Sequence, residues 1–122
     1  MLPGEYSEEA GMAAARHLLT EDRLPTAVLA GNDRCAVGLM HAFATAGLDV
    51  PKDISIVGYD DSHLSHLSYI DLTTVRQDAN RLAEQAVRQA VDRLEDETLE
   101  PRETVLDPKL VVRGTTGPPA AR

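Results

Sequence analysis

Residues 25–33 of the chain read PTAVLAGND, and residues 54–61 read ISIVGYDD. Each stretch begins with a short aliphatic run and ends in turn-forming and polar residues, which is typical of a buried strand followed by a turn. The pattern between them, from Arg34 to Ala46, is helical. A strand–helix–strand unit pairs its strands in parallel through a right-handed crossover. The sequence therefore predicts an α/β fold in which both strands end at one edge of a sheet.

Polar side chains follow both predicted strands. Asn32 and Asp33 come after the first strand, and Asp60 and Asp61 come after the second. Because open α/β sheets bind ligands at the carboxyl ends of their strands, we expect these four side chains to face one crevice. Asn32 or Asp33 is expected to cap the next helix, since both residue types are good helix caps. Asp33 and Asp61 are interpreted as capping or surface acids.

Composition narrows the class of protein. The 122 residues have the length of one domain, and 43% of them are hydrophobic without any long apolar run, which favours a packed core over a membrane span. The net charge of −8 argues against binding of this segment to the phosphate backbone of a nucleic acid. Cys35 is the only cysteine and is interpreted as a small packing residue. No signal peptide is visible in residues 1–15.

The rest of the chain adds further helices and short strands. Ser7 is a predicted helix cap, a third strand is predicted at Leu72–Val75, and Asp78 is expected to cap a helix whose apolar face continues to Leu94. The remaining expectations are a pair of short strands at 105–106 and 110–112 and a mobile tail at 114–122. A chain that begins with a helix and has so thin a sheet is expected to be part of a larger protein.

Five stretches, in order, resemble segments of the lactose-repressor-type (LacI/GalR) transcription regulators. The resemblance covers almost the whole chain. The stretches are residues 4–7 (GEYS) with Gly11, residues 25–33 followed by 36–38 (AVG), residues 47–61 (GLDVPKDISIVGYDD), residues 72–77 (LTTVRQ) and residues 110–116 (LVVRGTT).

The resemblance implies a periplasmic-binding-protein-like (type I) parallel-sheet sandwich of two α/β subdomains around a cleft. It also implies that the chain is incomplete. Residues 1–71 would form most of the C-terminal subdomain. Residues 72–113 would cross over and supply C-terminal elements of the other subdomain, ahead of the tail at 114–122. The helix from Asn80 to Leu94 would then lack much of its partner surface, so we expect self-association or domain exchange.

By position, the resemblance assigns four residues to an effector cleft. Tyr6 would stack on a flat or sugar-like ligand, and Asn32 and Asp60 would hydrogen-bond to its hydroxyl or amine groups. Gln77 lies in the crossover, where it would touch the ligand or the hinge. Capping of a helix by Asn32, and packing of Tyr6 against the first helix, remain open as purely structural alternatives.

The same resemblance places a dimer interface on Val37, His63, His66 and Tyr69. Ordinary core packing is an equal alternative for Val37. The family often has two prolines just before its LTTV segment, and Ile70-Asp71 stand there instead.

The implied function is effector sensing and dimerisation in a cytoplasmic regulator. A sugar-like effector would control DNA binding by a helix-turn-helix that this chain lacks, with no cofactor, metal, membrane contact or enzymatic activity. A fragment of an extracytoplasmic sugar-binding protein is the alternative. A metal site formed by Asp60, Asp61, His63 and His66, or a hydrolase with paired acids, is a weaker one, since no catalytic or metal-binding motif accompanies these residues.

Overall fold

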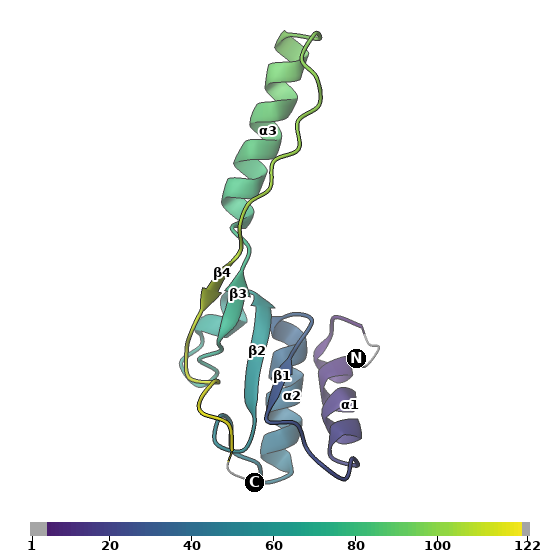
Figure 1. The fold of residues 1–122 in the computed structure, drawn as a ribbon, viewed down its shortest axis with the longest axis vertical. Coiled ribbons are helices and arrows are strands. Elements are labelled where there is room, and N and C mark those ends of the chain that lie inside the picture. The colour runs from purple at the N-terminus through teal and green to yellow at the C-terminus, as the bar shows by residue number, and fades with distance from the viewer. Residues whose placement is uncertain (1–4, 121–122) are drawn as a thin grey trace.

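The computed structural model describes residues 5–120, in which a small α/β body carries one long projecting arm (Figure 1). The elements of this described part, in chain order, are α1 (Glu8–Leu18), β1 (Ala27–Leu29), α2 (Asp33–Thr45), β2 (Ser55–Asp60), the 3₁₀ turn η1 (His63–His66), β3 (Thr74–Arg76), α3 (Ala79–Glu95) and β4 (Lys109–Val111).

The four strands form one sheet in the order β1-β2-β3-β4. β1 pairs with β2, and β2 with β3, in parallel, whereas β4 runs antiparallel to β3. The predicted parallel strand–helix–strand unit is therefore confirmed. The third strand begins at Thr74 and not at Leu72, and the predicted strand at 105–106 is wrong, because this stretch of the arm has no strand partner.

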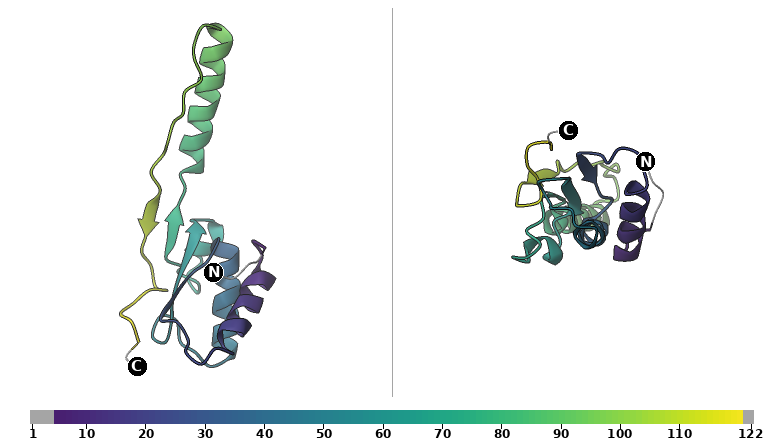
Figure 2. Two further views of the ribbon diagram at one scale, coloured as in Figure 1. Left: turned by 45° about the vertical axis from the view of Figure 1, so that its right-hand side comes forward. Right: turned by 90° about the horizontal axis from the view of Figure 1, so that it is seen from below.

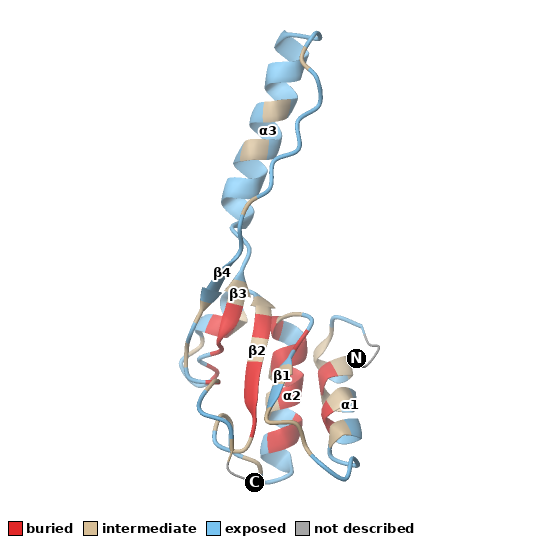
Figure 3. Ribbon diagram, in the orientation of Figure 1, coloured by how far each residue is buried: buried red, intermediate tan, exposed pale blue. Residues whose placement is uncertain are grey.

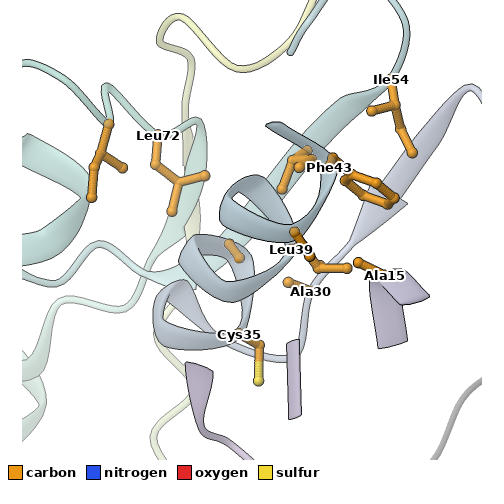
Figure 4. Close-up of a cluster of buried hydrophobic side chains, with 11 residues drawn as sticks. Ala15, Ala30, Cys35, Leu39, Phe43, Ile54 and Leu72 are labelled. Atoms are coloured by element: carbon orange, nitrogen blue, oxygen red, sulfur yellow. The ribbon is translucent and has the colours of Figure 1, made fainter. Parts of the chain in front are cut away.

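The core lies between the sheet and two helices. α2 packs on β2, and α1 packs alongside α2. Figure 4 shows Phe43 and Leu39 of α2 reaching toward Ile54 and Ala15, and all four side chains are buried. Burial of such aliphatic and aromatic surface is the main stabilising contribution to a fold of this size.

The two helices approach each other closely at two glycines. A Cβ atom on Gly11 would collide with the carbonyl oxygen of Cys35, and one on Gly38 would collide with that of Glu8. Cys35 itself is buried in this contact, and burial raises the pKa of its thiol, as expected of a packing residue and not of a nucleophile.

Side-chain caps fix where the helices begin. Ser7 Oγ accepts a hydrogen bond from the Ala10 N–H at 3.2 Å, and Asp78 Oδ1 accepts one from the Arg81 N–H at 3.1 Å. Both caps confirm the sequence prediction.

The predicted mobile tail at 114–122 is wrong for its first residues. The Ile56 N–H donates to the Thr115 carbonyl oxygen at 2.8 Å, and Thr115 Oγ1 donates back to the Ile56 carbonyl oxygen at 2.7 Å. Gly117 N–H donates to Ser55 Oγ at 3.1 Å. Residues 115–117 are therefore tied to β2, with Thr115 buried.

α3 and the extended segment that returns from it form the arm, which stands clear of the body in the left-hand view of Figure 2. No residue of α3 is buried, and Figure 3 shows the helix almost entirely exposed. Its apolar stripe includes Leu82, Val87, Val91 and Leu94, the last 82% exposed. Exposed apolar stripes of this kind favour association. No helix among residues 5–120 has the length and apolar character needed to cross a membrane.

We therefore predict that the 122-residue chain self-associates through the arm. Val87→Glu should weaken this association by placing a charge on the apolar stripe, whereas Gln85→Glu adds the same charge on the polar side of α3 and should leave it unchanged. Light scattering of the dilute protein measures the effect. A wild-type chain that stays monomeric and unfolds cooperatively would contradict the prediction.

Candidate ligand-binding site

Asn32 lies where β1 ends and α2 begins. Its side-chain Oδ1 accepts a hydrogen bond from the Cys35 N–H at 2.9 Å, so Asn32 is the helix cap. Its Nδ2 donates to the Tyr6 carbonyl oxygen at 3.2 Å. The amide is therefore held in place by two bonds, and its nitrogen keeps a second N–H for a further acceptor.

Tyr6 lies beside Asn32 at the same edge. Its ring is near Gly31, where a Cβ atom would stand 3.1 Å from Tyr6 Cε1. The side chain is 71% exposed. Tyr6 thus does not pack into the core of the helix pair, and its aromatic face is available to a flat partner.

Asp60 is the last residue of β2, and it is exposed. Its Oδ1 accepts a hydrogen bond from Gln77 Nε2 at 3.2 Å. Its backbone φ is +112°, a conformation that is unfavourable for residues other than glycine and that is often associated with function. The structure therefore pairs two of the predicted ligand residues, Asp60 and Gln77, directly.

Asn32, with Tyr6 beside it, and Asp60, with its partner Gln77, lie near the carboxyl ends of adjacent parallel strands, since β1 pairs with β2 from Ala27 to Leu29. Together they offer an aromatic face, an amide and a carboxylate. This inventory suits a neutral ligand rich in hydroxyl groups, which needs both donors and acceptors. Tyr6, Asp60 and Gln77 are exposed, so these residues form one open wall and not a closed site.

A groove of about 660 Å³ lies nearby, between α1 and β1. Tyr6, Gly31 and Tyr59 are among the residues that line it, and most of the others have aliphatic side chains. Asn32, Asp60 and Gln77 are not among its lining residues. The groove therefore follows the free edge of β1 and is not the polar site.

The prediction that Asp33 caps α2 is wrong, because Asn32 is the N-cap of this helix. Its side chain is 1% exposed, and it accepts hydrogen bonds from the Ser62 N–H at 2.6 Å and from Thr74 Oγ1. Asp33 therefore fastens the beginning of α2 to the turn after β2 and to β3. A Cβ atom on Gly58 would meet this carboxylate, so the strand can pass it only with glycine there.

Asp61 is also neither a cap nor a free surface acid, a second correction. Its side chain is 4% exposed, and Arg113 Nη2 donates to Oδ1 at 2.7 Å. Arg76 Nε donates to Oδ2, and Ser65 Oγ donates to Oδ1 at 3.0 Å. Burial raises the pKa of the Asp61 carboxyl, but these hydrogen bonds outweigh burial and lower the pKa to about 2.

Asp61 should make stability depend on pH in acid. Its pKa is lower in the folded chain than the ordinary 3.8, so the unfolded chain takes up the proton first as pH falls. The stabilisation, about 2 kcal/mol, is complete above pH 4 and disappears as pH falls toward 2. In urea unfolding, the stability gap between wild type and Asp61→Asn should shrink over this range.

The matched control is Asp22→Asn, which removes an exposed acidic charge from the loop after α1. Its stability gap to wild type should stay small at every pH. A gap for Asp61→Asn that is the same at pH 5 and at pH 2 would contradict the role assigned to this carboxylate.

The residues of the predicted dimer interface lie on and around η1 and α2. His63, His66 and Tyr69 are exposed, Tyr69 to 80%, whereas Val37 is half-buried and packs against the core. His66 Nε2 lies 3.3 Å from Asp61 Oδ1. Within residues 5–120 no cluster of three His, Cys, Asp or Glu side chains is placed to hold a metal ion, so nothing in the geometry supports the metal alternative.

These features define the class of protein as an α/β domain with polar residues at the carboxyl ends of two parallel strands, from which two strands lead to the projecting arm. Residues 2–116 match the family model described as the periplasmic binding protein-like domain. The chain belongs to this family.

Proteins similar to this chain include regulators of the LacI type. The chain is 37% identical over 117 residues to the HTH-type transcriptional repressor PurR of Glaesserella parasuis, covering 91% of this chain and 34% of that protein. A LacI transcriptional regulator from a Rhodococcus species superposes with a TM-score of 0.90 at 43% identity, covering 97% of this chain and 43% of that one.

A second structure has a bound ligand. The LacI family transcriptional regulator from Enterococcus faecalis V583, with bound ribose, superposes with a TM-score of 0.88 at 29% identity, over 96% of this chain and 43% of that one. The resemblance to LacI/GalR-type regulators is confirmed, and so is the incomplete periplasmic-binding-protein-like fold. The chain spans about a third of the length of the curated relatives that it matches.

Proposed function

We propose that this chain forms one wall of the effector site in a LacI/GalR-type transcription regulator, and that the effector is sugar-like. The observation that carries this proposal is that Asn32 and the exposed Asp60 both follow or end a strand at the carboxyl edge of the parallel pair β1–β2. A ligand there would alter the angle between two subdomains, and DNA would be contacted only through a helix-turn-helix outside these 122 residues.

The chemistry of the wall favours a sugar. Asp60 accepts hydrogen bonds from ligand hydroxyl groups, the Asn32 amide donates one, and Tyr6 covers an apolar ring face. Gln77, which already donates to Asp60, holds the carboxylate or reaches the ligand itself. The ribose bound by the Enterococcus relative supports the same ligand class.

Asp60→Ala should weaken binding in the full-length regulator. Loss of a hydrogen-bonded carboxylate costs about 1.5–3 kcal/mol, which corresponds to roughly a ten- to hundredfold loss of affinity. Calorimetric titration of ribose, then of a panel of sugars and nucleobases, measures this. Asp22→Ala is the control and should bind as wild type does. An unchanged affinity for the effector in Asp60→Ala would remove this residue from the site.

We further propose that the regulator works in the cytoplasm, without a cofactor and without catalysing a reaction. The similar proteins described above are named as regulators, which favours this reading over an extracytoplasmic sugar-binding protein. A regulator would also account for the exposed residues His63, His66 and Tyr69 on and around η1. Dimers bind two DNA half-sites with two DNA-binding domains, so a dimer interface is expected.

The proposed dimer interface consists of Val37, His63, His66 and Tyr69. Tyr69 supports it best, since a large and mostly exposed aromatic side chain is typical of interface anchors. Tyr69→Glu in the full-length regulator should shift the molecule from dimer toward monomer in sedimentation velocity. Ala13→Glu adds the same charge on the exposed side of α1 and should not. A dimer that withstands Tyr69→Glu and a matching change at His63 would contradict this interface.

A further inference from the structure

Two strands connect the body with the arm. β3 ends at Arg76 and leads into α3, and the returning chain re-enters the body through β4 (Figure 1). The two strands pair antiparallel, with Arg76 opposite Lys109. The direction of the arm is therefore set by what holds these two strands to the body.

In addition to the backbone pairing of β2 with β3, one carboxylate ties both strands to the body. Asp61 Oδ2 accepts from Arg76 Nε at the end of β3, and Asp61 Oδ1 accepts from Arg113 Nη2, two residues after β4, at 2.7 Å. Arg113 Nη1 also donates to the Leu72 carbonyl oxygen at 2.7 Å. The carboxylate thus lies between two guanidinium groups that belong to the outgoing and the incoming chain.

The backbone conformation at the end of β2 orients the Asp61 carboxylate toward Arg76 and Arg113. Asp61 has a φ of +51°, in the left-handed region, directly after Asp60. Aspartate and asparagine tolerate this region better than other side chains with a Cβ atom. The turn therefore presents two successive carboxylates to the crossover.

The two carboxylates bind successive residues of the outgoing chain. Asp61 bonds to Arg76, and Asp60 bonds to Gln77. The proposed effector residue and the ion-pair centre are therefore adjacent cross-links between the end of β2 and the beginning of the crossover.

We propose that Asp61 is a positioning residue: it fixes the orientation of the arm relative to the body by clamping Arg76 and Arg113 together, and so keeps Gln77 against Asp60. The consequence for the ligand rests on the proposed effector site, whereas the orientation of the arm does not depend on any ligand.

The physical reason is charge balance. With Asp61 ionised, the two guanidinium groups share one nearly buried negative charge. With a neutral amide in its place, one amide oxygen cannot serve both donors, and the amide N–H groups face guanidinium N–H groups. The two cations then repel each other, and the strands that carry them separate at the base of the arm.

The test measures the arm directly. Spin labels at Arg16→Cys on α1 and Arg93→Cys on α3, in a Cys35→Ala background, report the distance between body and arm by pulsed electron resonance. Excess unlabelled chain removes distances between copies. The wild-type chain should give one narrow distance distribution, and Asp61→Asn should lose this narrow peak and give a broad one. Asparagine suits the left-handed backbone, so the turn itself is preserved.

Two comparisons make the result decisive. Asp22→Asn should keep the narrow peak. Arg76→Gln removes only the bond between Arg76 and Asp61, and it should also broaden the distribution. Because the Arg76 side chain is partly exposed, this variant decides the question if Asp61→Asn does not fold. A folded Asp61→Asn or Arg76→Gln chain with a lower melting temperature but an unchanged narrow peak would overturn the positioning role. No ligand is present, so this result is independent of whether Asp60→Ala affects effector binding.

Discussion

The parallel pairing of β1 with β2 is the constraint on which the rest of the structure depends. Parallel neighbours must be joined by a crossover, which here is α2, and their carboxyl ends must meet at one edge. Asn32 and Asp60 are therefore brought together by topology and not by a contact between them. The proposed effector wall follows from this arrangement, because ligands bind at that edge of an open α/β sheet.

Two carboxylates outside the proposed effector wall hold the elements at this edge of the sheet together. Asp33 joins α2 to the turn after β2 and to β3, and Asp61 joins that turn to Arg76 and Arg113. A buried carboxyl group must be hydrogen-bonded, and in both residues each carboxyl oxygen accepts at least one hydrogen bond. Asp60 is exposed, and within residues 5–120 its carboxylate accepts a side-chain hydrogen bond from Gln77 only, which agrees with the proposed role as an acceptor for a ligand.

Local sequence signals predicted the elements, and long-range contacts account for the errors. Alternation of aliphatic runs with Gly31-Asn32 and Gly58-Tyr59 predicted the parallel unit, and Ser7 and Asp78 predicted two helix starts, because caps act within three residues of the chain. The roles of Asp33, Asp61 and Thr115 depend on partners 15 to 59 positions away, such as Ser62, Arg76, Arg113 and Ile56, which no local pattern reveals. The one available signal was the double acid at 60–61, since one of two adjacent carboxylates is free to turn inward.

The most direct test of the central claim is a crystal structure of the full-length regulator with its bound effector, beginning with ribose. The account predicts that the carboxylate of Asp60 and the amide of Asn32 contact ligand hydroxyl groups, with Tyr6 against the ring and Asp61 still bound to both arginines. A ligand seated in the groove between α1 and β1, with Asn32 and Asp60 free of contact, would contradict it.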